Sequence, residues 1–192
     1  MWSLLVSTVV VALAEMGDKT QLLSFVLAAR LKQKGAIVFG ILVATLANHF
    51  LAGYAGVFLS KIISPEVLKW SIALAFLVFG AWTLQPDTFE QKRKLSKQGV
   101  FLTTAVAFFL VEMGDKTQLA TIALAARYHA LVAVVLGTTL GMMIANVPAV
   151  WLGETLARRV NMRLLRWLAA ALFFLLAIMT IMASGKVTGY LL

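Results

Sequence analysis

The chain has 192 residues, of which 61% are hydrophobic and 13% are charged. A soluble globular domain averages about 45–50% apolar and about 25% charged residues, so this composition argues against a soluble enzyme and indicates a protein surrounded by lipid. There is no cysteine, which excludes disulfides, thiolate metal sites and cysteine nucleophiles. The net charge of +9 comes from basic residues clustered between apolar segments, which is typical of loops facing anionic lipid and not of a nucleic-acid-binding surface.

Six apolar segments follow one another along the chain, and each is long enough to cross a bilayer as a helix of about 20 residues. They cover residues 4–29, 36–60, 67–84, 100–126, 131–157 and 164–183. The first contains Ala12-Leu13-Ala14, which resembles a signal-peptide cleavage site, but no Lys or Arg precedes it. We therefore interpret it as a retained membrane helix, and the fold as an all-α polytopic membrane protein with six transmembrane helices.

An octapeptide occurs twice, since residues 15–22 and 112–119 both read Glu-Met-Gly-Asp-Lys-Thr-Gln-Leu. Extended to Arg30 and Arg127, the copies agree at 12 of 16 positions at an offset of 97 residues. An identity of this length that contains charges indicates a duplicated unit. The sequence predicts a three-helix repeat over residues 1–86, a charged connector over 87–98 and a second three-helix repeat over 99–192, all in one integral membrane domain.

The basic residues also predict the orientation of the chain. Eleven fall in connections on one side, namely Arg30, Lys32, Lys34, Lys92, Arg93, Lys94, Lys97, Arg158, Arg159, Arg163 and Arg166. Four fall on the other side, namely Lys61, Lys69, Arg127 and Lys186. The richer side is expected to be cytoplasmic, which places both termini outside. Because three helices are an odd number, the second repeat enters the membrane from the opposite side, and the repeats are expected to be inverted.

Both copies of the motif fall about halfway through an expected helix, near the middle of the membrane. Glu15 lies roughly eleven residues into its segment, or about 17 Å at about 1.5 Å per residue. On one continuous helix, Asp18 at i+3 and Lys19 at i+4 share the face of Glu15. Charges at the bilayer centre cost about 2.5–3.5 kcal/mol each, so the charged residues are expected to face one another, water or an ion. Gly17 and Gly114 allow close helix approach or local unwinding beside them.

Two interpretations of the motifs remain open. In the first, Glu15–Lys19 and Glu112–Lys116 are ion pairs that only fix helix packing. In the second, which we favour, four carboxylates against two lysines leave a double negative charge for a divalent cation or for protons. The principal metal-ligand candidates are Glu15, Asp18, Glu112 and Asp115; further candidates for ligands or coupling residues are Thr20, Gln21, Thr117, Gln118, Asn48, Asn146, Lys19 and Lys116. Such oxygen ligands suit Ca²⁺, Mn²⁺ or Mg²⁺.

Three of the polar residues outside the motifs also lie at mid-membrane positions. Asn48 and Asn146 match each other on the second and fifth segments, where each is either a further ligand or part of an interhelical hydrogen bond. His49 corresponds to Val147 in the other repeat and breaks the internal symmetry. It is either a proton carrier or a hydrogen-bonded packing residue.

Two copies of Glu-x-Gly-Asp-Lys-Thr in a six-helix chain of this size resemble the bacterial branch of the cation transporter family that includes the Golgi manganese/calcium transporters. The resemblance covers the whole chain and both motifs match it. It implies a transporter and not an enzyme, in the bacterial cytoplasmic (inner) membrane, which exchanges Mn²⁺ or Ca²⁺ for protons, with manganese export the usual bacterial role. The ion is then a substrate and no cofactor is permanently bound. The family's acidic pairs map onto Glu15, Asp18, Glu112 and Asp115.

Two alternatives of other classes stay open. One is a proton-coupled exporter of a cationic organic substrate such as a basic amino acid, whose ammonium groups also seek carboxylates. The other is a non-transporting membrane scaffold in which the motifs hold helices together. The expected partners are the ion, protons and the lipid bilayer, with no nucleic acid, and the sequence predicts no oligomeric state.

Overall fold

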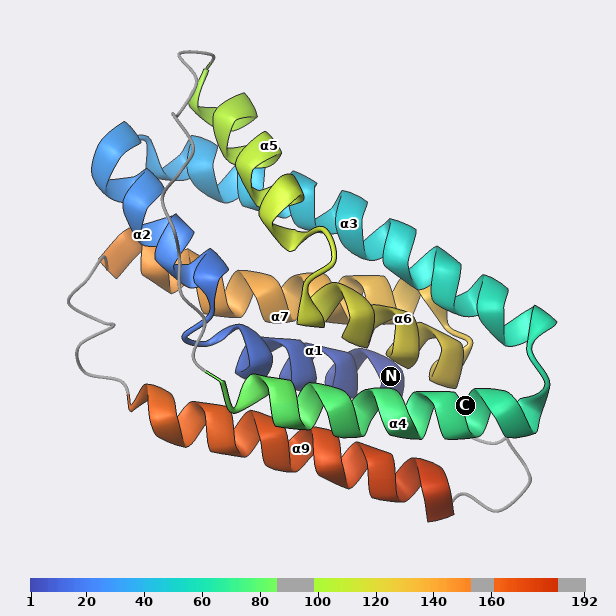
Figure 1. Ribbon diagram of the computed structural model, residues 1–192. Helices are drawn as coiled ribbons and strands as arrows, with labels where there is room; N and C mark the ends of the chain where they lie inside the picture. The colour runs from blue at the N-terminus through green and yellow to red at the C-terminus, as the bar shows by residue number, and fades with distance from the viewer. Residues whose placement is uncertain (86–98, 153–160, 183–192) are drawn as a thin grey trace.

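The computed structural model describes residues 1–85, 99–152 and 161–182, and within these ranges its regular secondary structure is all α-helical (Figure 1). The described helices are α1 (Trp2–Glu15), α2 (Lys19–Leu31), α3 (Lys34–Ile62), α4 (Pro65–Thr83), α5 (Val100–Glu112), α6 (Lys116–Tyr128), α7 (Leu131–Leu152) and α9 (Met162–Met182). The connector expected over residues 87–98 lies outside the described residues.

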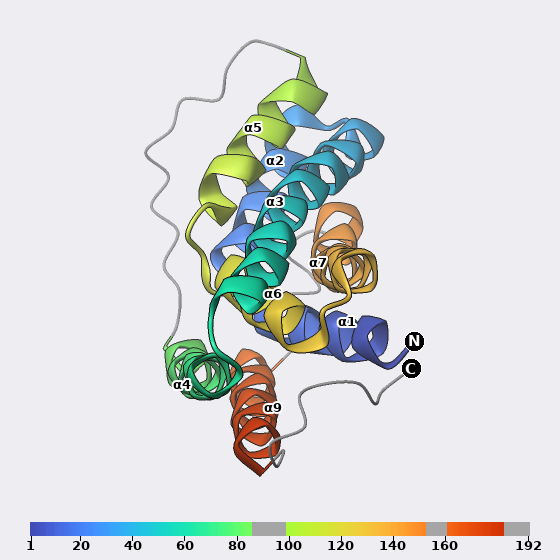
Figure 2. The same ribbon diagram turned by 90° about the vertical axis from the view of Figure 1, so that its right-hand side faces the viewer.

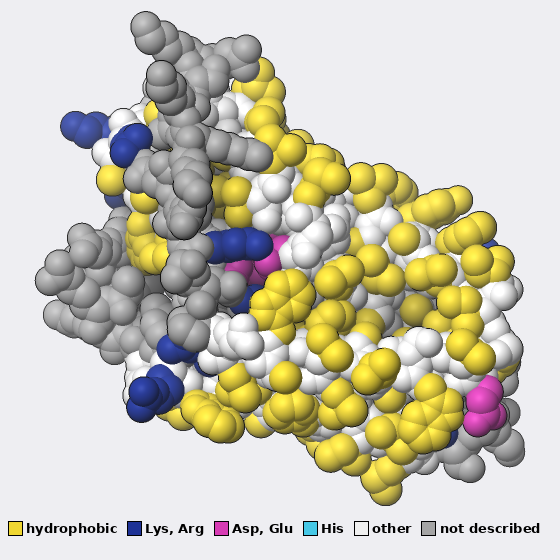
Figure 3. Space-filling view, viewed as in Figure 1, with side chains coloured by type: hydrophobic (Ala, Val, Ile, Leu, Met, Phe, Trp, Pro, Cys, Tyr) yellow, Lys and Arg dark blue, Asp and Glu magenta, His cyan; other side chains and the backbone are white. Residues whose placement is uncertain are grey.

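Four of the described helices, α3, α4, α7 and α9, are long and apolar enough to cross a membrane singly. Many large apolar side chains on these helices point away from the bundle, including Phe50, Tyr54 and Phe58 of α3 and Leu74 of α4. Figure 3 shows hydrophobic side chains over most of the described part of one face. An apolar exterior around buried polar residues is the arrangement of a polytopic membrane protein.

The structure corrects the expectation that the first and fourth segments are continuous helices. Each is two short helices separated by a break, α1 from α2 and α5 from α6. At the first break Met16 is extended, Gly17 has a φ of 84° and Asp18 is extended again; at the second, Gly114 has a φ of 77°. A positive φ ends an α-helix and is readily adopted by glycine alone. The motif therefore unwinds the chain, and Glu15 and Asp18 do not share a helix face.

Helix bounds recur at the offset of the sequence repeat. Helix α2 spans Lys19–Leu31 and α6 spans Lys116–Tyr128, which is 97 residues later at both ends. The same offset relates the first residues of α3 and α7, and those of α4 and α9. It also relates the non-glycine residues with positive φ, Lys32 at 55° and His129 at 51°. The duplication seen in the sequence therefore has a counterpart in local structure.

The short helices pack on the long helices of the other half of the chain. Helix α1 lies along α7 and α5 lies along α3, while α3 and α7 contact each other (Figures 1 and 2). Glycines permit these close approaches, since a Cβ added at Gly141 would lie 2.6 Å from the Thr8 carbonyl oxygen of α1, and one at Gly40 would lie 2.9 Å from the Phe101 carbonyl oxygen of α5. The two halves of the chain are thereby interlocked.

Helices α4 and α9 form a separate pair at one side of the bundle (Figure 2). Phe76 and Phe173, which correspond at the offset of 97, have ring centroids 6.2 Å apart, and Gly80 lies against Phe174. The pair packs on the rest of the molecule through α4 against α6 and α9 against α1. Among the described helices, neither α4 nor α9 packs to a comparable extent on α2 or α5. The pair therefore covers only one end of the interlocked helices.

Candidate ion-binding site

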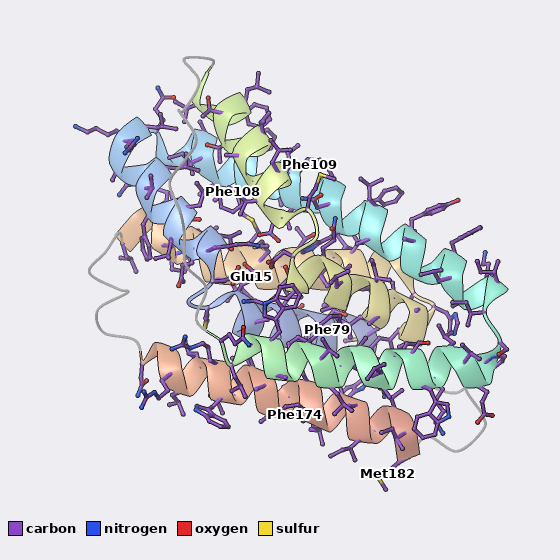
Figure 4. The ribbon with its side chains drawn as sticks, viewed as in Figure 1. Glu15, Phe79, Phe108, Phe109, Phe174 and Met182 are labelled. Atoms are coloured by element: carbon purple, nitrogen blue, oxygen red, sulfur yellow. The ribbon has the colours of Figure 1, made fainter. Side chains whose placement is uncertain are left out.

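The two helix breaks bring the acidic residues of both motifs to the centre of the molecule. Glu15 ends α1 and Glu112 ends α5, while Asp18 and Asp115 immediately precede α2 and α6. All four are at most 2% exposed. Figure 4 shows Glu15 in the middle of the bundle, where short helices from both halves meet. Acidic residues that lie 97 positions apart in the sequence thus share one buried region.

Three of the four carboxylates form a compact cluster. Glu15, Glu112 and Asp115 each contribute an oxygen that lies within 4.8 Å of the oxygens of the other two. Among the described residues, Oε1 of Glu15 and Oε1 of Glu112 have no hydrogen-bond partner. Buried polar atoms are nearly always paired, so the two free oxygens, together with the Asp115 carboxylate, make this cluster a candidate cation site.

The lysines of the motifs cross between the two halves of the chain. The Lys19 ammonium pairs with Oδ1 of Asp115, and the Lys116 ammonium pairs with Oδ1 of Asp18. These pairs replace the Glu15–Lys19 and Glu112–Lys116 pairs that a continuous helix would form at i, i+4, because the breaks turn each lysine away from the glutamate of its own motif. The charged residues therefore join the two halves directly.

The two lysines differ in their access to solvent. The Lys19 side chain is 26% exposed and the Lys116 side chain only 4%. Figure 3 shows basic and acidic side chains together near the middle of the displayed face, within a largely hydrophobic surround. Solvent therefore reaches the charged residues more easily beside Lys19 than beside Lys116.

Hydroxyl groups from the first turns of α2 and α6 orient the glutamates. Thr20 donates to Oε2 of Glu15 at 2.5 Å, and Thr117 donates to Oε2 of Glu112 at 3.1 Å. The amides at the start of these helices also carry partial positive charge, which stabilises nearby carboxylates. Each threonine holds one glutamate oxygen and leaves the other available.

The glutamines of the two motifs, Gln21 and Gln118, hydrogen-bond to the backbone at the helix breaks. Oε1 of Gln21 accepts the Gly17 amide at 2.9 Å, and Oε1 of Gln118 accepts the Gly114 amide at 2.7 Å. The Gln21 amide nitrogen donates to the Ala145 carbonyl of α7 at 3.0 Å. Both glutamine oxygens thus satisfy backbone groups that the broken helices leave unpaired, and this stabilises the conformation of each break.

Asn48 and Asn146 make the interhelical contacts that were one of their two expected roles. Nδ2 of Asn48 donates to the Phe109 carbonyl of α5 at 3.0 Å. Oδ1 of Asn146 accepts the Ser24 hydroxyl of α2 at 2.7 Å. Ser24 is therefore a further residue near the site that the sequence analysis did not identify. It lies two residues beyond the octapeptide, carries no charge and belongs to no motif. These contacts link the halves around the acidic cluster.

His49 makes no hydrogen bond with the part of the chain that the structure describes. It is fully buried in α3, and within the described residues neither ring nitrogen makes a hydrogen bond. The expectation that it is a hydrogen-bonded packing residue is therefore wrong. Its helix, α3, packs on α5 and α6, which flank the second acidic motif.

The net charge of the motif residues favours a divalent cation. Four carboxylates and two ammonium groups carry a charge of −2 when all are ionised, and a dication brings the total to zero. Carboxylate and hydroxyl oxygens are hard ligands of the kind that Mn²⁺, Ca²⁺ and Mg²⁺ bind. An arrangement with this charge and these donors is suited to binding a single divalent ion.

Comparison with known proteins agrees with this assignment. The family profile described as "Divalent cation/proton antiporter GDT1" matches residues 3–91 and 100–187. A Vibrio cholerae protein named "Putative manganese exporter" is 46% identical over 178 residues, covering 92% of this chain and 89% of that protein. A GDT1-like protein of Synechocystis is 28% identical over 192 residues, covering 88% of this chain and 92% of that protein. GDT1-like protein 3 of rice is 28% identical over 198 residues, covering 89% of this chain and 70% of that protein. No solved structure matches the chain.

Proposed function

Because the chain belongs to the GDT1 family of divalent cation/proton antiporters, we propose that it exports Mn²⁺ from the bacterial cytoplasm in exchange for protons. The observation that carries the proposal is the cluster of Glu15, Glu112 and Asp115, whose carboxylate oxygens lie within 4.8 Å of one another at the centre of the molecule. Family membership also decides against an exporter of basic amino acids and against a scaffold that transports nothing.

The proposed topology has six crossings, two of which are made by broken helices. Helices α1 and α2 have 14 and 13 residues, so at about 1.5 Å per residue the pair is about 40 Å long, which exceeds a hydrocarbon core of about 30 Å. Helices α5 and α6 form the second broken crossing. Three crossings per repeat make the repeats inverted, with both termini outside and residues 87–98 in the cytoplasm. Discontinuous helices at the centre of inverted repeats are typical of ion-coupled transporters.

In the proposed site, Glu15, Glu112 and Asp115 bind the cation directly. Asp18, the fourth acidic residue of the motifs, lies outside this three-carboxylate cluster and pairs with Lys116, so in this proposal it balances the buried ammonium beside the ion. The C-terminal ends of α1 and α5 carry partial negative charge, which adds to the attraction for a cation. Each repeat thus contributes a glutamate, and the second repeat contributes the ligating aspartate.

Manganese is proposed as the principal substrate, with calcium as the competing one. Three carboxylates and nearby hydroxyl groups form an oxygen site that both ions accept. The name of the relative that is 46% identical refers to manganese, and this supports Mn²⁺ over Ca²⁺ for the present chain.

The charge of the site suggests an exchange of two protons for each ion. With both lysines protonated, the site carries −2, so one dication or two protons make it neutral. A neutral site crosses a low-dielectric barrier far more easily than one that carries two negative charges. The cation-loaded and the doubly protonated carrier are therefore the forms that change conformation, and this enforces coupling.

Flux through purified protein in liposomes tests the proposal. A pH gradient should drive Mn²⁺ movement, and Glu15→Gln and Glu112→Gln should each abolish it, because an amide keeps the shape of the side chain but loses its charge. The matched control is Glu66→Gln, since Glu66 lies exposed in the first turn of α4 and its substitution should leave the flux unchanged. Wild-type flux in both site variants would refute the proposed site.

A further inference from the structure

Arg127, near the end of α6, connects that helix to α9 by hydrogen bonds. Its Nη1 donates to the Leu176 carbonyl oxygen at 3.1 Å and also to the Thr180 hydroxyl. The Thr180 hydroxyl in turn donates to the Leu176 carbonyl at 2.6 Å. Arg127 is half-buried and Thr180 is 6% exposed. These three residues form what we call the outer latch, because the proposed topology places this end of α6 and α9 at the outer face.

The same three positions exist in the first repeat, where the contact is not assembled. Subtracting the offset of 97 from the latch residues gives Arg30, Phe79 and Thr83, so the arginine and the threonine are both repeated. Thr83 is 1% exposed, and within the described residues its hydroxyl has no hydrogen-bond partner. Arg30 is exposed at the end of α2. A buried hydroxyl without a partner is unfavourable, so an arginine that reached Thr83 in another arrangement of the helices would satisfy it.

Helices α4 and α9 also pack more closely on one end of the bundle than on the other, and the closely packed end is the one that contains the Arg127 contact. The pair contacts α1 and α6, and neither member packs comparably on α2 or α5 among the described helices. Figures 1 and 2 show α2 and α5 projecting away from α4 and α9. In the proposed topology α1 and α6 lie in the outer half of the membrane, and α2 and α5 in the cytoplasmic half. Among the described helices, α4 and α9 thus pack on the outer half of the bundle and not to a comparable extent on the cytoplasmic half.

We propose that a second latch, formed by Arg30 with the Thr83 hydroxyl and the Phe79 carbonyl, replaces the outer latch when the transporter opens to the outside. The inference rests on the inverted topology of the proposed function. Helices α4 and α9 are joined through Phe76 and Phe173 and move as one body, so closing on α2 and α5 requires leaving α1 and α6. The two latches are therefore alternatives, and each stabilises one of the two conformations between which the carrier exchanges.

Cysteine cross-linking tests the exchange, because the natural chain contains no cysteine. The variants are Arg127→Cys/Thr180→Cys for the outer latch and Arg30→Cys/Thr83→Cys for the second one. Each is treated in liposomes with a bis-methanethiosulfonate reagent about as long as an arginine side chain, which joins the two cysteines through reducible disulfides. Both pairs should cross-link, and each cross-link should abolish Mn²⁺ flux until a reductant cleaves it. The four single-cysteine variants are the controls, and the treatment should not change the flux that each of them shows beforehand.

A third variant keeps the test decisive if the Arg127→Cys/Thr180→Cys chain folds poorly. Adding Arg127→Gln to the Arg30→Cys/Thr83→Cys chain removes the outer latch and should increase the rate of cross-linking at the second one. An unchanged rate, or flux that continues through the cross-linked Arg30–Thr83 pair, would overturn the latch. Failure of the proposed function has a different signature, since the cysteine-free parent would then move no Mn²⁺ in the same liposomes, whether or not either pair cross-links.

Discussion

The ammonium group of Lys19 pairs with Asp115, which lies 96 residues further along the chain, instead of with Glu15 on its own motif. Asp115 is also one of the three clustered carboxylates, so in the proposed site the lysine and the cation interact with the same side chain. The equivalent residue of the other repeat, Lys116, pairs with Asp18, which is outside that cluster. Of the two lysines that are equivalent in the repeat, Lys19 therefore pairs with a carboxylate of the cluster and Lys116 pairs with a carboxylate outside it.

The first prediction is that the two lysines differ in their effect on stability. Lys116→Gln leaves the buried Asp18 carboxylate without its ammonium partner, and removing one member of a buried ion pair costs about 3–5 kcal/mol. Lys19→Gln should cost less, because the Lys19 side chain is 26% exposed and water reaches the pair. Thermal unfolding in detergent should show a clearly larger loss for Lys116→Gln, and equal losses would contradict the assignment.

The second prediction concerns the electrical behaviour of Lys19→Gln. The substitution removes a positive charge from the side of the site that contains Asp115, so a bound dication no longer makes the site neutral. Mn²⁺ binding should tighten, and flux should become dependent on the membrane potential. Isothermal titration and flux at several clamped potentials measure the two effects. If Lys19→Gln binds Mn²⁺ no more tightly than the parent, Lys19 does not compete with the ion.

The third prediction tests the helix breaks. Gly114 has a φ of 77° and open space around an added Cβ, so Gly114→Ala introduces strain from the backbone alone, of about 1–2 kcal/mol. The matched control is Gly35→Ala, because Gly35 lies in the first turn of α3, also with open space around an added Cβ. That substitution should be neutral or stabilising by up to about 1 kcal/mol. A similar change in unfolding temperature for both variants would count against a strained break.

The fourth prediction concerns the threonines that orient the glutamates. Thr20→Val keeps the size of the side chain and removes the hydrogen bond to Oε2 of Glu15. Mn²⁺ affinity should fall by about tenfold, which corresponds to a hydrogen bond of about 1.4 kcal/mol to a charged group. Thr45→Val is a suitable control, because the Thr45 hydroxyl is buried and makes no hydrogen bond within the described residues. Equal affinities of the two variants would show that Thr20 does not orient Glu15.

Part of the site follows from sequence alone. The identical octapeptides and their mid-segment position predict that acidic residues from both halves converge, and the structure brings Glu15, Glu112 and Asp115 together. Gly17 and Gly114 also mark where unwinding is possible. These inferences need only the repeat and the cost of placing charge in lipid.

Other parts depend on tertiary structure and are not encoded in local patterns. The pairing of Lys19 with Asp115 depends on where α2 points after the break, whereas helical periodicity favoured Glu15 as its partner. The contact between Arg127 and Thr180 joins α6 to α9, and nothing in either helix distinguishes it from the repeated positions Arg30 and Thr83. The difference between the two ends of the bundle arises from packing, which an internal sequence repeat cannot reveal.

The most direct test of the account is the flux of Mn²⁺ through purified protein in liposomes, with the pH gradient and the membrane potential set independently and proton movement recorded at the same time. Two protons should move against each ion, so the pH gradient should drive flux while the clamped potential leaves it unchanged. Flux that follows the potential and ignores the pH gradient would identify a channel or uniporter and contradict proton-coupled exchange at the Glu15–Glu112–Asp115 cluster.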